Sequence, residues 1–134
     1  MERMNCALLV DEWISGTFLV YKVLRKIKLF NTINIERGSV NSLNFVQNFA
    51  KANNNCCPEL IVINCKTLGS EGFLFLELLS QQNFSNKEKV KIIAIGSFPE
   101  TVSIKDVIVI REPVTAEAFL KILDSENRFK IAAA

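Results

Sequence analysis

The side chains best suited to chemistry stand directly after short apolar segments. Asp11 and Glu12 follow the first such segment, Asn64 closes a central one and Glu112 follows the last. Carboxylates bind hard cations such as Mg²⁺ or Ca²⁺, and they can act as nucleophiles. The amide of Asn64 is a poor nucleophile, although it stands where a reactive group would be expected. Asn64 is therefore the residue that a functional interpretation must explain.

Several other kinds of site are excluded by composition. The sequence has no His, which removes Cys/His zinc sites and the Ser-His and Cys-His couples of nucleophilic catalysis. Its four cysteines form no C-x-x-C pair, so we expect free thiols in a reduced compartment. The stretch 69–72 contains two glycines but lacks the spacing of a nucleotide-binding loop. These absences remove the usual thiol, hydroxyl, zinc-dependent and nucleotide-dependent chemistries.

Length and charge describe one globular domain, residues 1–134. Hydrophobic residues make up 49% of the chain, including ten Phe, which favours a packed core. The net charge is +2 and the basic residues are scattered, so neither nucleic acid nor an anionic membrane is the expected partner. No apolar run reaches the roughly 20 residues of a membrane span, and charges interrupt the N-terminal segment. We expect a cytoplasmic protein.

The elements that must position these side chains can be predicted from periodicity. Short apolar runs at 5–10, 32–35, 59–64, 90–95 and 107–110 predict five strands. Runs without polar alternation are typical of parallel strands buried on both faces. Apolar residues at helical spacing predict helices that begin near Ile14, Val40 and Gly72, and Phe18 is expected on the inward stripe of the first. A short loop is expected between Asn64 and Gly72, and Thr115 is the expected N-cap of a closing helix.

Alternating strands and helices predict an α/β fold. We expect a flavodoxin-like, doubly wound, five-stranded parallel sheet in the order 2-1-3-4-5. Only nine residues, 97–105, separate Gly96 from Asp106, whereas a parallel crossover usually needs about a dozen or more. We therefore expect the fourth helix to be short or absent. Residues 131–134 are expected to form a frayed tail.

The predicted topology brings the strand ends together at one edge of the sheet. The expected pocket at this edge consists of Asp11, Glu12, Asn64, Gly96, Ser97, Glu112 and Pro113.

This pattern resembles the response-regulator receiver domains of two-component signalling, the CheY-like family. The resemblance covers nearly the whole chain and rests on residues 8–12, residues 57–64, Gly72 and Phe73 eight residues beyond Asn64, and Pro113. It implies that two acidic residues hold Mg²⁺ and that an Asp ending the third strand accepts a phosphoryl group from a histidine kinase. It also implies a Thr or Ser after the fourth strand and a Lys before the Pro, both binding phosphoryl oxygens.

The chain departs from that pattern at most of the functional positions. Asp11 and Glu12 match the acidic pair, but Asn64 replaces the phospho-acceptor. Gly96 takes the hydroxyl position, with Ser97 one place later, and Glu112 replaces the Lys. An added carboxylate would repel a phosphoryl group by a few kcal/mol at intermediate dielectric, on the order of 4 kcal/mol at 4 Å. The loss of nucleophile, hydroxyl and Lys together predicts that the phosphorylation cycle is gone.

We therefore expect a stand-alone, degenerate receiver domain that acts through protein contacts, as a binding module and not an enzyme, and with no cofactor. Its expected partner is a signalling protein or a second copy of the chain. The predicted partner surface is the apolar helix after Gly72, namely Phe73, Phe75, Leu76 and Leu79. The alternative is a flavodoxin-like domain that binds a small molecule or a divalent ion in the strand-end pocket. If Mg²⁺ binds, the expected ligands are Asp11 and Glu12 with help from Glu112 and Asn64.

Overall fold

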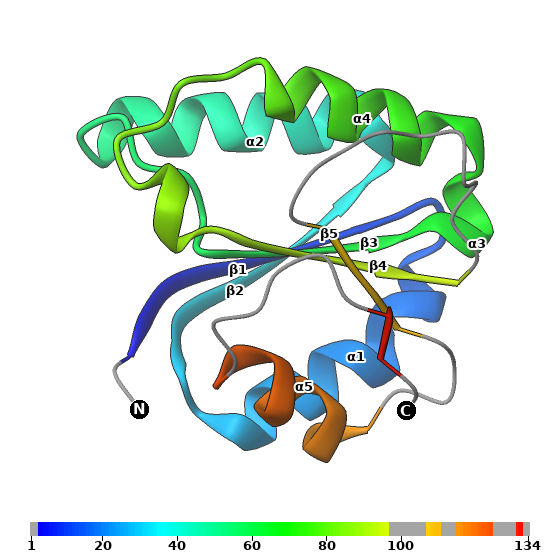
Figure 1. The fold of residues 1–134 in the computed structure, drawn as a ribbon. Helices are drawn as coiled ribbons and strands as arrows, with labels where there is room; N and C mark the ends of the chain where they lie inside the picture. The colour runs from blue at the N-terminus through cyan, green and yellow to red at the C-terminus, as the bar shows by residue number, and fades with distance from the viewer. Residues whose placement is uncertain (1–2, 97–106, 111–114, 125–130, 133–134) are drawn as a thin grey trace.

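The computed structural model describes residues 3–96, 107–110, 115–124 and 131–132, which form one parallel sheet between two layers of helices (Figure 1). The strands are β1 (Met4–Asp11), β2 (Phe30–Arg37), β3 (Leu60–Asn64), β4 (Lys91–Ile95), β5 (Val107–Ile110) and β6 (Ile131–Ala132). The helices are α1 (Ile14–Ile27), α2 (Gly38–Ala52), α3 (Cys65–Leu68), α4 (Ser70–Ser80) and α5 (Ala116–Leu123), with a single 3₁₀ turn, η1 (Lys87–Lys89).

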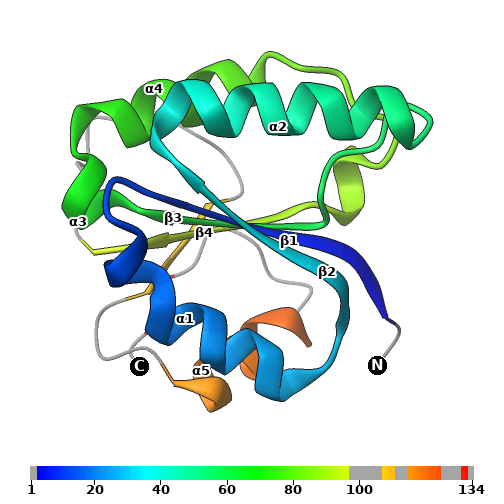
Figure 2. The same ribbon diagram turned by 180° about the vertical axis from the view of Figure 1, so that it is seen from behind.

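The strand order is β2-β1-β3-β4-β5-β6, and every neighbouring pair is parallel. This confirms the predicted fold class and the order 2-1-3-4-5 of the first five strands. Helices α1 and α5 cover one face of the sheet and α2 and α4 cover the other, as the two opposite views show (Figures 1 and 2). The sheet is therefore doubly wound, and its central strands have no face open to water.

Two hydrophobic cores lie on the two sides of the sheet. Ala7 and Leu9 of β1 point into the core beneath α1 and α5, while Leu8 and Val10 point into the core beneath α2 and α4. The same alternation continues along β3, all five residues of which are buried. An apolar side chain is needed on both faces, which explains the unbroken apolar runs in the sequence.

The closing helix is held at both ends. Thr115 caps its start as predicted, its Oγ1 accepting a hydrogen bond from the amide of Ala118 at 3.1 Å. At the other end, the ammonium group of Lys91 on β4 donates to the carbonyls of Ile122 and Leu123. Cations are favourable at helix C-termini because the last carbonyls carry partial negative charge. These contacts fix α5 against the sheet.

The predicted partner surface is wrong for three of its four residues. Phe75, Leu76 and Leu79 are buried at 0%, 0% and 5% exposure in the core beneath α2 and α4, and Phe73 is half-buried against the same core. Helix α4 packs against both α2 and the strand residues of the core beneath it, which accounts for apolar residues around most of its circumference. The exposed apolar residue of this helix is Leu74, which the prediction did not include.

Three smaller predictions also require correction. Phe18 was expected to face inward but is 51% exposed, and Thr17 lies buried beside it. The stretch after Asn64 was expected to be a loop but forms the one-turn helix α3. Ile131 and Ala132 were expected to fray but pair with Val109 and Ile110 as β6, which covers backbone groups that an edge strand β5 would leave unpaired.

The prediction that the fourth helix is short or absent concerns residues 97–106, which lie outside the described residues. The predicted pocket residues Ser97, Glu112 and Pro113 also lie outside them. Within the described part of the chain, no helix is both long and apolar enough to cross a membrane.

The reassignment of Phe75 from surface to core can be tested with two variants from the same helix. F75A should lower the free energy of unfolding by about 3–5 kcal/mol, because it removes a fully buried ring and leaves a cavity. L74A should change it by about 0.5 kcal/mol or less, because half of that side chain is already in water. Urea denaturation measures both. A small loss of unfolding free energy in F75A would contradict the burial of Phe75.

Candidate functional site

The strand-end pocket is centred on the carboxylate of Asp11, the last residue of β1. The register pairs Val10 with Ile63, so Asp11 and Asn64 stand beside each other where β1 and β3 end. Asp11 is 1% exposed and Asn64 is 8% exposed. A buried carboxylate must receive hydrogen bonds to remain charged, since burial removes its water. The donors to Asp11 therefore define the chemistry of the pocket.

Three donors converge on this carboxylate. The Asn64 side chain donates from Nδ2 to Asp11 Oδ2 at 3.1 Å. The Thr67 hydroxyl on α3 donates to Asp11 Oδ1, and the amide of Trp13 donates to the same oxygen at 3.2 Å. Both carboxylate oxygens are thus occupied by neutral donors. Hydrogen bonds to a charged group contribute roughly 1.5–3 kcal/mol each, so the arrangement holds β1, β3 and α3 together.

Asn64 has only one possible orientation in this network. A carboxylate accepts but cannot donate, so the amide nitrogen must face Asp11. The amide oxygen then points elsewhere, and Asn64 Oδ1 is fully buried with no hydrogen-bond partner among the described residues. An unpaired buried acceptor costs about 1–3 kcal/mol. The pocket therefore contains one unsatisfied acceptor next to a satisfied carboxylate.

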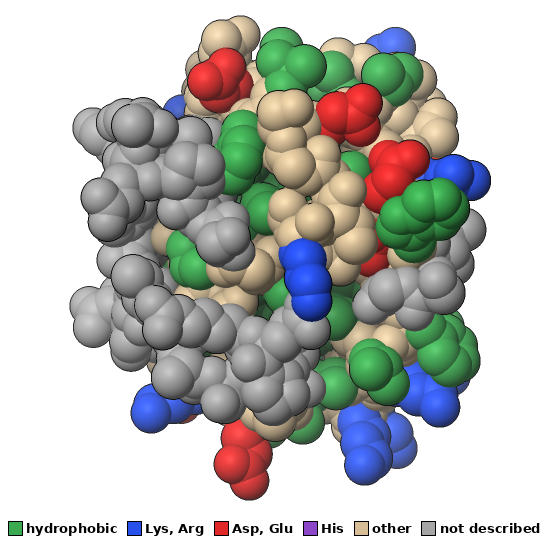
Figure 3. All heavy atoms as spheres, turned by 90° about the vertical axis from the view of Figure 1, so that its right-hand side faces the viewer, with side chains coloured by type: hydrophobic (Ala, Val, Ile, Leu, Met, Phe, Trp, Pro, Cys, Tyr) green, Lys and Arg blue, Asp and Glu red, His purple; other side chains and the backbone are tan. Residues whose placement is uncertain are grey.

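Glu12 does not join Asp11. Its carboxylate is partly exposed and lies 3.9 Å from the guanidinium of Arg37, at the end of β2. That guanidinium also stacks over the Trp13 ring, with 5.4 Å between its central carbon and the ring centroid. An exposed ion pair of this length contributes at most about 1 kcal/mol. Figure 3, which looks onto this edge of the sheet, shows acidic side chains beside exposed hydrophobic ones.

Magnesium requires oxygen ligands arranged around one point. The oxygens of Asp11 are occupied by three donors and Glu12 turns toward Arg37. Among the described residues, no three acidic or thiol side chains gather closely enough to hold a metal ion. The described part of the pocket, as arranged, does not fit a divalent cation, and the predicted ligation by Asp11 and Glu12 stays a prediction.

Gly96 follows β4 at the position where the resemblance requires a hydroxyl. Its φ of +108° lies in a region that side chains rarely adopt, and its amide donates to Ile110 O at 3.1 Å. A Cβ built on Gly96 would lie 3.3 Å from both Cβ and N of Lys66. A hydroxyl-bearing residue would therefore be strained by the backbone conformation here, and Lys66 would have to shift by a few tenths of an ångström to admit it.

Thr67 is a residue at the strand ends that the sequence reasoning did not assign. The signal for Thr67 was a hydroxyl three residues after Asn64, which one helical turn brings back to the strand end. Its Oγ1 also lies 3.2 Å from the main-chain oxygen of Asn64. Cys65, the next residue after Asn64, is buried in the core beneath α2 and α4, and burial raises the pKa of its thiol to about 11. The thiol is therefore protonated at neutral pH and unreactive.

Comparison with known proteins supports the fold independently. No protein-family profile and no curated protein sequence matches the chain. Solved structures do match. A CheY-like response-regulator receiver domain from Methylobacillus flagellatus superposes with a TM-score of 0.69 at 14% identity, covering 92% of this chain and 99% of that one.

Two further structures agree. The chemotaxis protein CheY4 of Vibrio cholerae gives a TM-score of 0.66 at 21% identity, covering 90% of this chain and 96% of its own. A two-component response regulator from Cytophaga hutchinsonii gives 0.58 at 17% identity, covering 99% of this chain and 87% of its own. At such identities the likeness establishes the receiver-domain fold.

The close approach at Gly96 can be measured against Gly38, which also has a positive φ, of +79°, but open space around its missing Cβ. G38A should cost about 1 kcal/mol of stability from backbone strain alone. G96A should cost more, by about 1 kcal/mol, because Lys66 must also move. Chemical denaturation gives both values. Equal losses would mean that the contact with Lys66 carries no penalty.

Proposed function

We propose that this chain is a receiver-like domain of two-component signalling that does not undergo aspartyl phosphorylation and that acts through contacts with other proteins. The observation that carries the proposal is Asn64, buried at the end of β3 with its amide donating to Asp11. An amide cannot form an acyl phosphate with a phosphoryl donor, so this position has no nucleophile. The receiver fold of the solved neighbours supports the signalling role.

The hydrogen bonds around Asn64 support more than a passive replacement. An aspartate at this position would place a second carboxylate about 3 Å from Asp11, away from water. Two such charges repel strongly unless a cation or a proton lies between them. Asn64 removes this requirement, because it supplies a donor in place of a charge. The pocket is then stable in a single arrangement, and the protein contacts would be constitutive.

Gly96 and Glu112 support the same proposal. Gly96 has no hydroxyl, and its backbone conformation and the nearby Lys66 disfavour a side chain, so a phosphoryl oxygen would lose that partner. Glu112 is an acid where receivers that resemble this chain carry a Lys. Each change removes an attraction for a dianion or adds a repulsion.

A second candidate function rests on the unpaired Oδ1 of Asn64. A ligand with a hydrogen-bond donor, or a divalent cation that displaces Thr67 from Asp11, would satisfy this oxygen. The strand-end pocket would then serve a small-molecule or ion-binding domain. This candidate differs from the first in needing a ligand at Asn64.

Beryllofluoride distinguishes these functions, because this phosphoryl mimic needs an aspartate in order to bind. Amide NMR spectra recorded with Mg²⁺ alone, and then with Mg²⁺ and beryllofluoride, should show no saturable change on addition of beryllofluoride. Saturable shifts around Asp11 and Asn64 with Mg²⁺ alone would favour the ion-binding candidate. A full response to beryllofluoride would contradict the proposed function.

The Asp11–Asn64 contact can be tested by N64D, with N64A as the matched control that removes the hydrogen bond without adding charge. N64D should lower the free energy of unfolding at pH 7 by about 1–3 kcal/mol more than N64A does. The introduced carboxyl is protonated more easily in the folded protein than in the unfolded chain. Its penalty is therefore full at neutral pH and disappears as the pH falls.

Urea denaturation at pH 7 and near pH 4 measures this difference. A variant N64D as stable as the wild type at pH 7 would show that Asn64 does not neutralise a repulsive site.

A further inference from the structure

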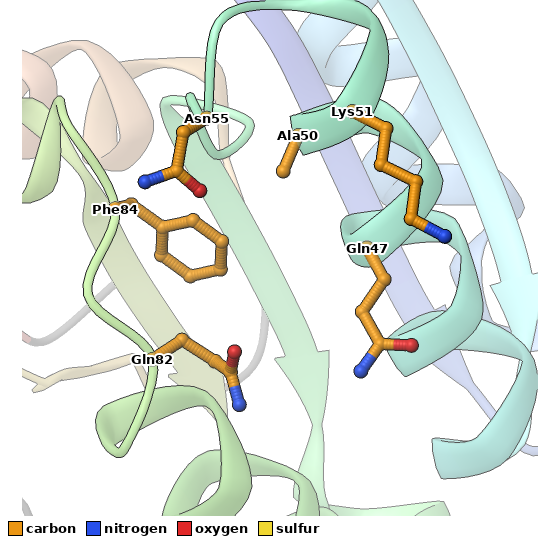
Figure 4. Close-up of a pocket in the computed structure, with 6 residues that line it drawn as sticks. All are labelled: Gln47, Ala50, Lys51, Asn55, Gln82 and Phe84. Carbon is orange, nitrogen blue, oxygen red and sulfur yellow. The ribbon is translucent and has the colours of Figure 1, made fainter.

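A pocket lies at the opposite end of the strands from Asp11 and Asn64. It has a volume of about 580 Å³ and is lined by Gln47, Ala50, Lys51, Asn55, Gln82 and Phe84. One wall is the C-terminal half of α2 with the turn that leads to β3, and the other is the chain between α4 and η1 (Figure 4). Its volume is within the range of small-molecule sites, about 300–1,000 Å³.

The end of this pocket is rigidly built. The turn after α2 contains two consecutive non-glycine residues with positive φ, Asn54 at +54° and Asn55 at +61°. Such conformations cost free energy and persist only where surrounding contacts impose them. The contacts that impose them here come from the segment 83–86, on the other wall.

Hydrogen bonds join the two walls at this end. Asn55 donates from its backbone amide to Ala50 O at 2.8 Å and from Nδ2 to Asn83 O at 3.0 Å, and its own carbonyl accepts from the Ser85 amide at 2.9 Å. Asn86 adds a bidentate pair to the backbone of Cys57, with both distances 2.8 Å. This end of the pocket is thus fixed in shape before any ligand binds, which lowers the entropic cost of binding.

The groups left facing the cavity are polar on its sides and aromatic in its middle. Because the Nδ2 group of Asn55 is bound to Asn83, its Oδ1 remains as an acceptor and is directed toward the ring of Phe84 (Figure 4). Gln47 and Gln82 approach from the two walls, each with an amide that donates and accepts. The small side chain of Ala50 leaves space opposite the Phe84 ring.

The charge of the lining residues indicates which kind of ligand the pocket would favour. Lys51 is the charged residue that lines the pocket, and no carboxylate does. A site with an aromatic ring and several amides, and with one ammonium group at its rim directed away from the ring (Figure 4), suits a planar ring with hydrogen-bonding edges that is joined to an anion reaching that rim. Aromatic–base stacking contributes through the ring, the amides can pair with donor and acceptor atoms on the base edge, and the ammonium attracts the anion.

We propose that this pocket binds a nucleoside monophosphate, with the base beside Phe84 and the phosphate toward Lys51. The site is independent of the proposed function, because none of its residues belongs to the strand-end pocket. It would give the domain a small-molecule input.

The test is an NMR titration of the ¹⁵N-labelled full chain with AMP, GMP, CMP and UMP, each up to about 10 mM. At least one nucleotide should give saturable shifts of the side-chain amides of Gln47, Asn55 and Gln82. F84L, which keeps apolar bulk without a ring, should lower the affinity for that nucleotide at least about tenfold. K51A should lower this affinity about three- to tenfold. K121A, a lysine substitution on α5 across the sheet, should leave the affinity unchanged.

Two further arms separate the base from the phosphate. The free nucleoside should shift the same amides with lower affinity, and inorganic phosphate alone should perturb only the surroundings of Lys51. The proposal is overturned if no nucleotide gives saturable shifts, if inorganic phosphate reproduces the whole response, or if F84L binds like the wild type. None of these results would bear on the beryllofluoride experiment, which reports on the other edge of the sheet.

Discussion

The buried charge of Asp11 is the constraint on which the strand-end region depends. A carboxylate at 1% exposure keeps its charge only if donors replace its lost water, and three donors do so from β3, α3 and the first turn after β1. Each of these three segments contributes one donor to Asp11. Asn64 ends β3 as a donor, α3 turns at once to present Thr67, and the chain reverses after Asp11 so that the Trp13 amide can reach it.

Much of the fold was predictable because parallel strands buried on both faces leave a strong signal in the sequence. The runs that became β1, β3, β4 and β5 contain almost no polar residue, and the alternation with helices then determines the strand order. The site was predictable to the extent that Asp11 and Asn64 end neighbouring strands. Thr67 was missed because a single helical turn such as α3 has too few residues to show periodicity.

The wrong predictions about helix faces share one physical cause, which is that hydrophobicity alone does not reveal which side of a helix is covered. Helix α4 has apolar residues on several sides, and packing against α2 and the sheet buried Phe75, Leu76 and Leu79 while leaving Leu74 in water. Phe18 matched the helical period but faces outward, and the ammonium of Lys22 lies 4.9 Å from its ring centroid. The pocket near Phe84 was equally hidden, because its walls meet only through the tertiary contacts of Asn55.

A satisfied Asp11 also bears on how such a domain could carry a signal. To move a two-state equilibrium from 1:99 to 99:1, an input must favour one state by about 5.5 kcal/mol. A phosphoryl group with its cation would bring charge-assisted interactions to the strand ends, whereas Asn64, Thr67 and Trp13 contribute neutral donors that are present without any input. Regulation of the proposed contacts would therefore have to act away from the strand ends. The pocket lined by Asn55, Gln82 and Phe84 meets this condition. It lies near the residues where β3 and β4 begin, whereas the strand-end pocket lies where β1 and β3 end.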